Sequence, residues 1–232
     1  ENEASFVIGF TVTDGDGDKA DGNLTLLIDD DTPTVLPTYD SVMTNNYRII
    51  SDDDTARDVT GNQGGNGDSG EWHKTGNLVG AFSAGADGGT VAWNAVNSSN
   101  ESGDLTPGIT FEIDPNTGSL SMFQQQGTEK VQIVEITMED TTTGQYTYTQ
   151  INNLLHVNDG QNTENDAKFL LGFTVTDGDG DKADGKLQLI IDDDTPTVVP
   201  YETNTMRIIS DDDTVAGLNG NSGYGNNPSD GA

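Results

Sequence analysis

The sequence predicts an all-β protein made of antiparallel Ig-like or cadherin-like β-sandwich repeats in tandem. Three observations support this prediction: apolar and polar residues alternate along many short segments, turn-forming residues separate these segments, and one long stretch occurs twice. Residues 8–37 and 171–200 are identical at 25 of 30 positions, at an offset of 163 residues. A period of this length indicates an array of large modules rather than a solenoid of short repeats.

Each copy of the repeat predicts a β-hairpin with a long acidic turn. In the first copy, alternate residues of 6–12 and of 24–28 are apolar and are expected to face inward. Residues 169–175 and 187–191 repeat this pattern in the second copy. An Asp- and Gly-rich turn separates the two strands in each copy, which is typical of a hairpin connection.

Between the two copies the alternation predicts further strands. They are expected over residues 78–82, 90–96, 109–113, 120–122 and 131–140, and from Tyr146 onward. The alternation slips near Val134, and a turn is predicted from Asp114 to Gly118, where Pro115 and the glycine suit turn geometry. No stretch keeps a helical apolar pattern over three turns, so no helix is expected.

The repeat also predicts how the chain divides. Residues 1–33 are expected to be the C-terminal part of one repeat, 34–196 a complete repeat, and 197–232 the start of the next. A second echo supports this division, because residues 48–55 return unchanged as 207–214. An isolated hairpin is marginally stable, so we expect the first segment to be held by the central module or by another chain.

The composition limits the classes of partner. The chain has 232 residues, forty acidic and nine basic, for a formal net charge of −31. Such charge repels itself unless cations neutralise it, and it disfavours nucleic acid and anionic membranes as partners. There is no apolar run of about 18 residues or more, so no membrane insertion is expected. The chain has no cysteine, which leaves metal ions as the available cross-link.

The acidic turns carry the strongest chemical signal. Asp14, Asp16 and Asp18 alternate with glycines, and Asp21 follows; residues 177–184 repeat the arrangement. Alternating glycines let the backbone curl so that several carboxylates converge. Converged carboxylates suit Ca²⁺, which accepts six to eight oxygen ligands, better than Mg²⁺ or Zn²⁺. The sequence departs from an EF-hand loop at its sixth and twelfth positions, so carbonyls, water or another carboxylate must complete the site.

Four Asp-Asp-Asp triplets extend the prediction. In each repeat copy, one triplet follows the second strand and precedes a proline. The other two triplets lie in residues 48–55 and in their echo at 207–214. A junction built from two triplets would bind a cation and stiffen the array, whereas the competing interpretation treats the triplets as solvated charge. The predicted calcium ligands are Asp14, Asp16, Asp18, Asp21, Asp29, Asp30, Asp31, Asp52, Asp53, Asp54, Asp177, Asp179, Asp181, Asp184, Asp192, Asp193, Asp194, Asp211, Asp212 and Asp213.

The chain is not expected to be an enzyme. Paired carboxylates are inevitable among forty acids, and no nucleophile, phosphate-loop or metalloprotease motif occurs. His73 and His156 are isolated, and each is expected to be a packed or surface histidine rather than a catalytic base. Trp72 could stack on a sugar, whereas Trp93 lies in a strand pattern and is expected in the core.

Four segments resemble the tandem β-sandwich repeats of giant type I-secreted RTX adhesins of Gram-negative bacteria. The segments are residues 144–148, 154–156, 169–181 and 187–196. The glycine-rich RTX nonapeptide is absent, so the resemblance is to an extender region. It implies a biofilm-type surface adhesin displayed outside the bacterial cell, with Ca²⁺-dependent folding after export and a stalk role. By the same resemblance, the acids of both Asp-Gly turns would be calcium ligands.

Two alternatives remain open at this stage. The chain could be a carbohydrate- or partner-binding module of the adhesin, with an aromatic platform near the Gly- and Asn-rich loops at 56–70 and 216–232. It could also be a self-assembling filament or surface-layer subunit, in which the first hairpin completes the sheet of another copy. The leading hypothesis makes neighbouring repeats of the same chain the main partners.

Overall fold

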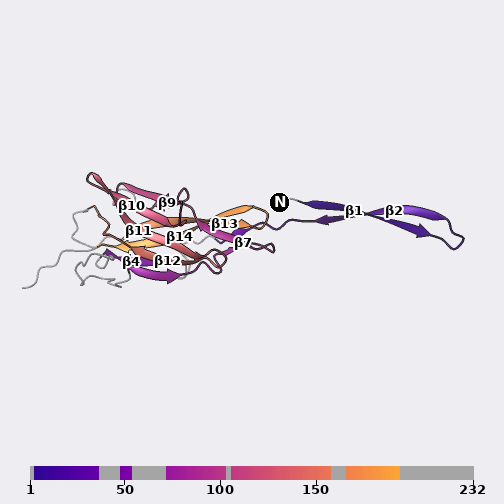
Figure 1. Ribbon diagram of the computed structural model, residues 1–232, viewed down its shortest axis with the longest axis horizontal. Coiled ribbons are helices and arrows are strands. Elements are labelled where there is room, and N and C mark those ends of the chain that lie inside the picture. Colours follow the sequence, from indigo (N-terminus) through magenta and orange to yellow (C-terminus); the bar gives the residue numbers. More distant parts are fainter. Residues whose placement is uncertain (1–2, 37–47, 54–71, 103–105, 158–165, 194–232) are drawn as a thin grey trace, which may run out of the picture. The chain divides into compact units, whose positions relative to one another are not determined.

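A computed structural model describes residues 3–36, 48–53, 72–102, 106–157 and 166–193. It confirms the all-β prediction, because these residues form fourteen strands and no helix (Figure 1). Accordingly, this part of the chain contains no helix long and apolar enough to cross a membrane.

The chain divides into two compact units, and only the first contains described residues. The first unit runs from Glu1 to Pro196 and the second from Thr197 to Ala232. This division falls at the expected start of the next repeat. Both predicted Gly- and Asn-rich loops, residues 56–70 and 216–232, lie entirely outside the described residues.

Two five-stranded sheets form the body of the first unit. The first sheet has the order β5-β12-β11-β10-β9, and all its pairs are antiparallel. Its strands are β5 (His73–Gly76), β12 (Gln145–Gln150), β11 (Glu129–Asp140), β10 (Leu120–Gln126) and β9 (Ile109–Ile113). The predicted strands at 109–113, 120–122 and 131–140 are therefore confirmed, as is the strand that begins near Tyr146.

The second sheet is mixed rather than purely antiparallel. It has the order β4-β14-β13-β7, and β8 also pairs with β13. Its strands are β4 (Arg48–Asp52), β14 (Lys182–Asp192), β13 (Ala167–Asp177), β7 (Gly89–Trp93) and β8 (Ser99–Asn100). The β4–β14 pair is parallel, which the sequence did not predict. As a consequence, Asp52 lies beside Asp192 where the two strands end.

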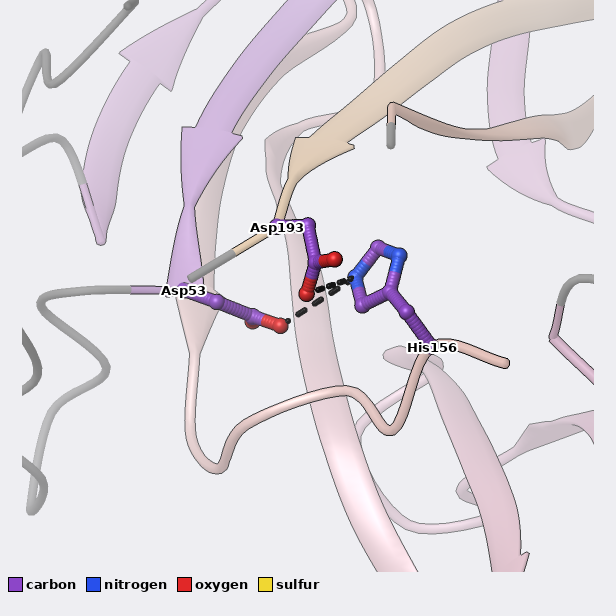
Figure 2. Close-up of side chains that lie close together, drawn as sticks. All are labelled: Asp53, His156 and Asp193. Carbon is purple, nitrogen blue, oxygen red and sulfur yellow. Dashed lines mark ion pairs between the residues drawn. The ribbon is translucent and has the colours of Figure 1, made fainter. Parts of the chain in front are cut away.

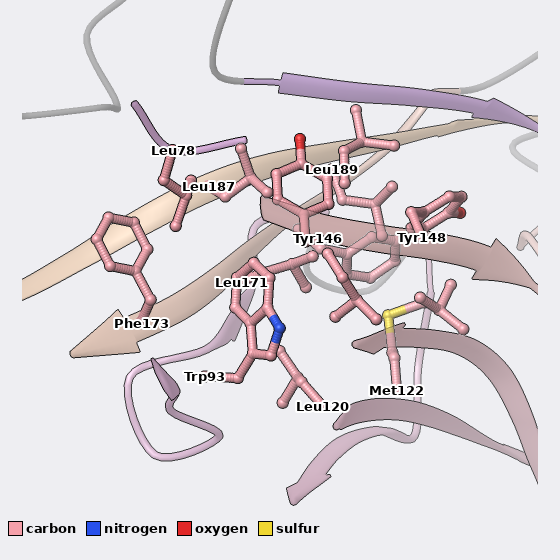
Figure 3. Packing of buried hydrophobic residues seen from close by; sticks show 14 of the residues in the cluster. Leu78, Trp93, Leu120, Met122, Tyr146, Tyr148, Leu171, Phe173, Leu187 and Leu189 are labelled. Atoms are coloured by element: carbon pink, nitrogen blue, oxygen red, sulfur yellow. The ribbon is translucent and has the colours of Figure 1, made fainter. Parts of the chain in front are cut away.

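One hydrophobic core joins the two sheets (Figure 3). Trp93 of β7 packs edge-on against Tyr146 of β12, with ring centroids 5.8 Å apart. Tyr148 and Phe173 are fully buried, from opposite sheets. The core position predicted for Trp93 is confirmed, and the two tyrosines are unavailable as a platform for sugars.

A β-bulge explains why the alternation slips along β11. Met122 of β10 lies opposite Val134, but the next residue, Phe123, lies opposite Gln132. Ile133 is therefore the extra residue on β11, and both Ile133 and Val134 are buried. The backbone carbonyl of Ile133 accepts a hydrogen bond from Ile151 N at 2.7 Å. The bulge thus lets two consecutive apolar side chains enter the core.

The predicted strand over 78–82 is wrong for most of its length. Ala81 N donates to Leu78 O at 2.8 Å, and Gly80 has a φ of 84°, so the chain turns sharply here. Both Leu78 and Ala81 are fully buried. Their apolar character therefore reflects a turn packed into the core, and only β6 (Phe82–Ser83) continues as a strand, paired with β3 (Thr34–Val35).

The first repeat copy forms a separate hairpin, β1 (Ala4–Thr13) with β2 (Lys19–Ile28). Its register equals that of β13–β14: Phe6 lies opposite Leu26, as Phe169 lies opposite Leu189. The inward orientation predicted for its apolar residues is wrong within the described structure, since Phe6 is 52% exposed and Leu26 is 44% exposed. The core contains no residue of this hairpin, because no described strand is added to either of its edges.

Candidate metal sites

The first acidic turn is organised around the side chain of Asp14. Its Oδ1 atom accepts hydrogen bonds from the backbone amides of Asp16 (3.3 Å), Gly17 (3.0 Å) and Asp18 (2.9 Å). Gly17 adopts a φ of 103°, which a glycine tolerates without strain. The turn brings carboxylate oxygens of Asp14, Asp16 and Asp18 within 4.8 Å of one another, and all three residues are exposed.

The second acidic turn has the same backbone but a more buried first aspartate. Asp177 Oδ1 accepts hydrogen bonds from the amides of Gly180 (2.9 Å) and Asp181 (2.7 Å). Asp177 is only 7% exposed, and its Oδ2 atom is buried with no hydrogen-bond donor among the described residues. A carboxylate oxygen removed from water with no donor is unfavourable, and a bound cation would satisfy it.

The linker after the first hairpin adds a carboxylate to the second turn. Carboxylate oxygens of Asp30, Asp179 and Asp181 lie within 4.8 Å of one another. The linker is fixed nearby, because Asp31 Oδ2 accepts a hydrogen bond from Ala86 N at 2.6 Å. The sequence required a carboxylate, carbonyl or water from elsewhere to complete this loop, and Asp30 is such a carboxylate.

The protonation equilibria of the second turn reflect crowded negative charge. Interaction with the Asp177 carboxylate is the main cause that raises the pKa of Asp179; burial and the charge of Asp30 add to it. For Asp177, burial acts to raise the pKa, but the interaction with Asp179 and the amide hydrogen bonds outweigh it and hold the pKa below its usual value. A divalent cation would relieve this repulsion between neighbouring carboxylates.

A third group lies at the other triplets and contains a histidine (Figure 2). Asp53 follows β4, Asp193 follows β14, and His156 lies in the segment after β12. The Nε2 atom of His156 is 3.3 Å from Asp53 Oδ2 and 3.9 Å from Asp193 Oδ1. Both carboxylates therefore approach the same ring nitrogen, from the ends of two adjacent parallel strands.

Asp53 is held in place by a buried hydrogen-bond network. Leu154 N donates to both of its oxygens, at 3.2 and 3.1 Å, and Gln150 Nε2 donates to Oδ1. Gln150 Oε1 in turn accepts a hydrogen bond from Ser51. Asp53 is 1% exposed, and this burial raises its pKa although His156 acts in the opposite direction.

The remaining predicted ligands divide into three sets. Asp21 and Asp184 lie within strands, where each accepts a hydrogen bond from a threonine of the facing strand, at 2.7 and 2.5 Å. Asp29, Asp31, Asp52 and Asp192 belong to none of the three groups that the described residues form. Outside the described residues lie Asp54, Asp194, Asp211, Asp212 and Asp213.

Sequence reasoning did not find His156 as a member of a charged cluster. It predicted a packed or surface histidine, and the side chain is indeed 3% exposed. The cluster forms through the parallel pairing of β4 with β14, which places two acidic triplets side by side. That pairing joins segments about 140 residues apart and leaves no trace in local periodicity.

Comparison with known proteins matched no family model, no curated protein and no solved structure. The residues of the three groups themselves indicate which ions each group suits. Two of the groups contain only carboxylates, from the Asp-Gly turns and, in the second group, also from Asp30 of the linker, and all-oxygen sites of this kind suit hard divalent cations. The third combines carboxylates with an imidazole and suits a different class of ion.

Proposed function

We propose that this chain is a calcium-binding structural repeat, an extender or stalk segment, of a large secreted bacterial surface adhesin. The observation that carries the proposal is the meeting of Asp30 with Asp179 and Asp181, beside the buried oxygen of Asp177. An ion held there would tether the linker that follows one repeat copy to the acidic turn of the next. Calcium would thereby stiffen the joint between successive modules.

The donor set favours Ca²⁺ over other common ions. Several carboxylates are present, and the Asp87 carbonyl lies close to the turn, since a Cβ placed on Gly178 would be 3.0 Å from it. Ca²⁺ takes six to eight oxygens in flexible geometry, whereas Mg²⁺ demands a compact octahedron and gives up its water reluctantly. Asp177, Asp179, Asp181 and Asp30 would be the protein ligands, completed by backbone oxygen or water.

The net charge suggests how calcium would control folding. At −31 the chain repels itself where calcium is scarce, as in the cytosol, and millimolar calcium outside the cell would remove that repulsion. Extracellular calcium modules bind with Kd of roughly 10⁻⁴ to 10⁻³ M. Each site adds about 1.4 kcal/mol to the free energy of unfolding at a tenfold excess of Ca²⁺ over Kd, and about 2.7 kcal/mol at a hundredfold excess.

The exposed first hairpin supports a neighbouring module as the main partner. Its strands leave large apolar side chains uncovered, among them Phe6, Phe10 and Leu24, each about half exposed or more. In β13–β14 a nearly identical sequence is covered by β4, by β7 and by the facing sheet. We therefore propose that a module of the same fold, from the same chain or from another copy in a filament, covers β1–β2.

Thermal unfolding followed by circular dichroism tests the calcium proposal. The chain would be melted with EDTA, then with stepwise Ca²⁺ up to about 10 mM, with Mg²⁺ as the control ion. The proposal predicts a rise in Tm of tens of degrees that is specific to Ca²⁺, or folding from a disordered state. A melting curve that is indifferent to EDTA would overturn it and leave the aspartates as solvating charge.

A further inference from the structure

We infer that Asp53, His156 and Asp193 form a binding site for a transition-metal ion of the Zn²⁺ class, separate from the calcium sites. The donor set is the first reason. Ca²⁺ takes oxygen ligands, whereas neutral imidazole together with carboxylates suits Zn²⁺, Ni²⁺, Cu²⁺ or Fe²⁺. The acidic triplets alone would indicate calcium, and the histidine between them changes the class of ion.

The spacing of the donor atoms is the second reason. A tetrahedral ion with ligands at about 2.0–2.1 Å separates neighbouring donor atoms by about 3.3–3.4 Å. Asp53 Oδ2 is 3.3 Å from His156 Nε2, and Asp193 Oδ1 is 3.9 Å from the same nitrogen. Charge-assisted hydrogen bonds between these groups would be about 2.7–2.9 Å long. The first distance equals the coordination spacing, the second exceeds it by about 0.5 Å, and all three donor atoms lie within 4.8 Å of one another, so a small closure would let one ion bind them.

The burial of the histidine is the third reason. His156 is 3% exposed, and neither ring nitrogen makes a hydrogen bond within the described residues. Figure 2 shows the ring directed at both carboxylates, with Nε2 between them. Nε2 therefore meets the two carboxylates at ion-pair distance without a hydrogen bond, and coordination of a metal ion would use its lone pair.

A supporting shell already holds one ligand in position. Asp53 is oriented by the amide of Leu154 and by Gln150, which is itself fixed by Ser51. Metal ligands commonly depend on such outer partners, and loss of a partner weakens metal binding about 10- to 100-fold. Gln150 would thus be a positioning residue for this site. A cation here would join the ends of β4 and β14 to the segment after β12.

The test is calorimetric titration of the full chain with Zn²⁺ in a buffer with about 10 mM Ca²⁺, which fills the calcium sites first. We expect one equivalent of Zn²⁺ to bind, and His156→Gln to weaken that binding at least about tenfold. His73→Gln is the matched control, because His73 is exposed and is the only other histidine. Gln150→Ala should weaken binding while all three ligands remain.

A second measurement does not depend on how the variants fold. Zn²⁺ added to the unaltered chain should shift the NMR signals of the His156 ring nitrogens, while those of His73 stay in place. The inference is overturned if Zn²⁺ does not bind saturably in the presence of Ca²⁺. It is also overturned if the His73 signals shift equally, or if both histidine variants lose the same affinity. None of these outcomes would contradict the calcium proposal, which rests on other residues.

Discussion

The two hairpins β1–β2 and β13–β14 have nearly the same sequence but opposite surroundings. They share their strand register, and the first aspartate of each turn caps its backbone. Yet Phe10 is 52% exposed in the first hairpin, while the equivalent Phe173 is fully buried in the second. The local sequence therefore determines the hairpin and its turn, whereas other segments determine whether the hairpin becomes part of a core.

The same contrast holds for the acidic turns. In the first hairpin, Asp14, Asp16 and Asp18 stay exposed, and no other described residue joins their group. In the second, Asp177 is buried and Asp30 approaches from the linker. If the carboxylates bind calcium, the turn with the additional ligand and the buried oxygen should bind it more tightly. Matched substitutions in the two copies can separate what the local sequence does from what its surroundings do.

The largest difference is expected for the matched phenylalanines. Phe173→Ala removes a fully buried ring and should lower the free energy of unfolding by about 3–5 kcal/mol. Phe10→Ala removes a half-exposed ring and should change it by about 0.5 kcal/mol or less. Urea unfolding followed by tryptophan fluorescence measures the free energy of unfolding of the two variants. The two tryptophans lie outside the first hairpin, so their signal reports the unfolding of the rest of the unit. Equal losses would mean that the first hairpin is also packed into a core.

A smaller difference is expected for the matched glycines. A Cβ on Gly185 would collide with the ring of Phe173 and lie 2.6 Å from Val35 Cγ1, so Gly185→Ala should lower the free energy of unfolding by about 1–3 kcal/mol. A Cβ on Gly22 would lie 2.6 Å from Phe10 Cζ, but that half-exposed ring has room to rotate away. Gly22→Ala should therefore stay within about 1 kcal/mol of the parent. The same urea series measures both, and a reversed order would contradict the burial of β13–β14.

The smallest effect concerns the turn after β11, where Asp140 accepts hydrogen bonds from the backbone of the turn. Asp140 Oδ1 accepts hydrogen bonds from Thr142 N (2.7 Å) and Thr143 N (3.3 Å), which hold the pKa of Asp140 below its usual 3.8. Because the folded pKa is depressed, the stabilisation is present above pH 3.8 and disappears as the pH falls through the folded value. Asp140→Asn should therefore be slightly less stable than the parent at pH 7.

Urea unfolding at several pH values checks this prediction. The gap between the parent and Asp140→Asn should close as the pH is lowered below 3.8. Asp114→Asn is the companion variant, because Asp114 accepts a hydrogen bond from Asn116 N at 2.8 Å and its pKa is lowered in the same way. A gap that widens in acid would show that the carboxylate does not stabilise the turn as an anion.

Local patterns predicted much of this fold, and long-range pairing accounts for what they missed. Alternation found the hairpins and every strand of the first sheet except β5, and it marked the bulge at Ile133 as a slip. It misread residues 78–82, because a buried turn and a strand can share the same apolar residues. The parallel β4–β14 pair was out of reach, since register between distant segments depends on the whole core.

The candidate sites divide along the same line. The repeat identified the acidic turns, because their ligands are local in sequence. Asp30 and His156 were different: Asp30 was predicted as a ligand without its partners, and His156 was not predicted as one. Both reach their clusters only through tertiary contacts. Spacing also grouped Asp21 and Asp184 with the turns, and strand pairing places each of them opposite a threonine that donates a hydrogen bond to it.

Calcium titration calorimetry on three proteins tests the central claim most directly: the unaltered chain, Asp177→Asn and Asp14→Asn. The two substitutions make the same chemical change at equivalent positions of two turns with the same sequence. The account predicts that Asp177→Asn removes the tighter binding event while Asp14→Asn leaves it intact. Equal effects of the two substitutions, or no effect of either, would contradict the claim that surroundings complete the site in the second copy.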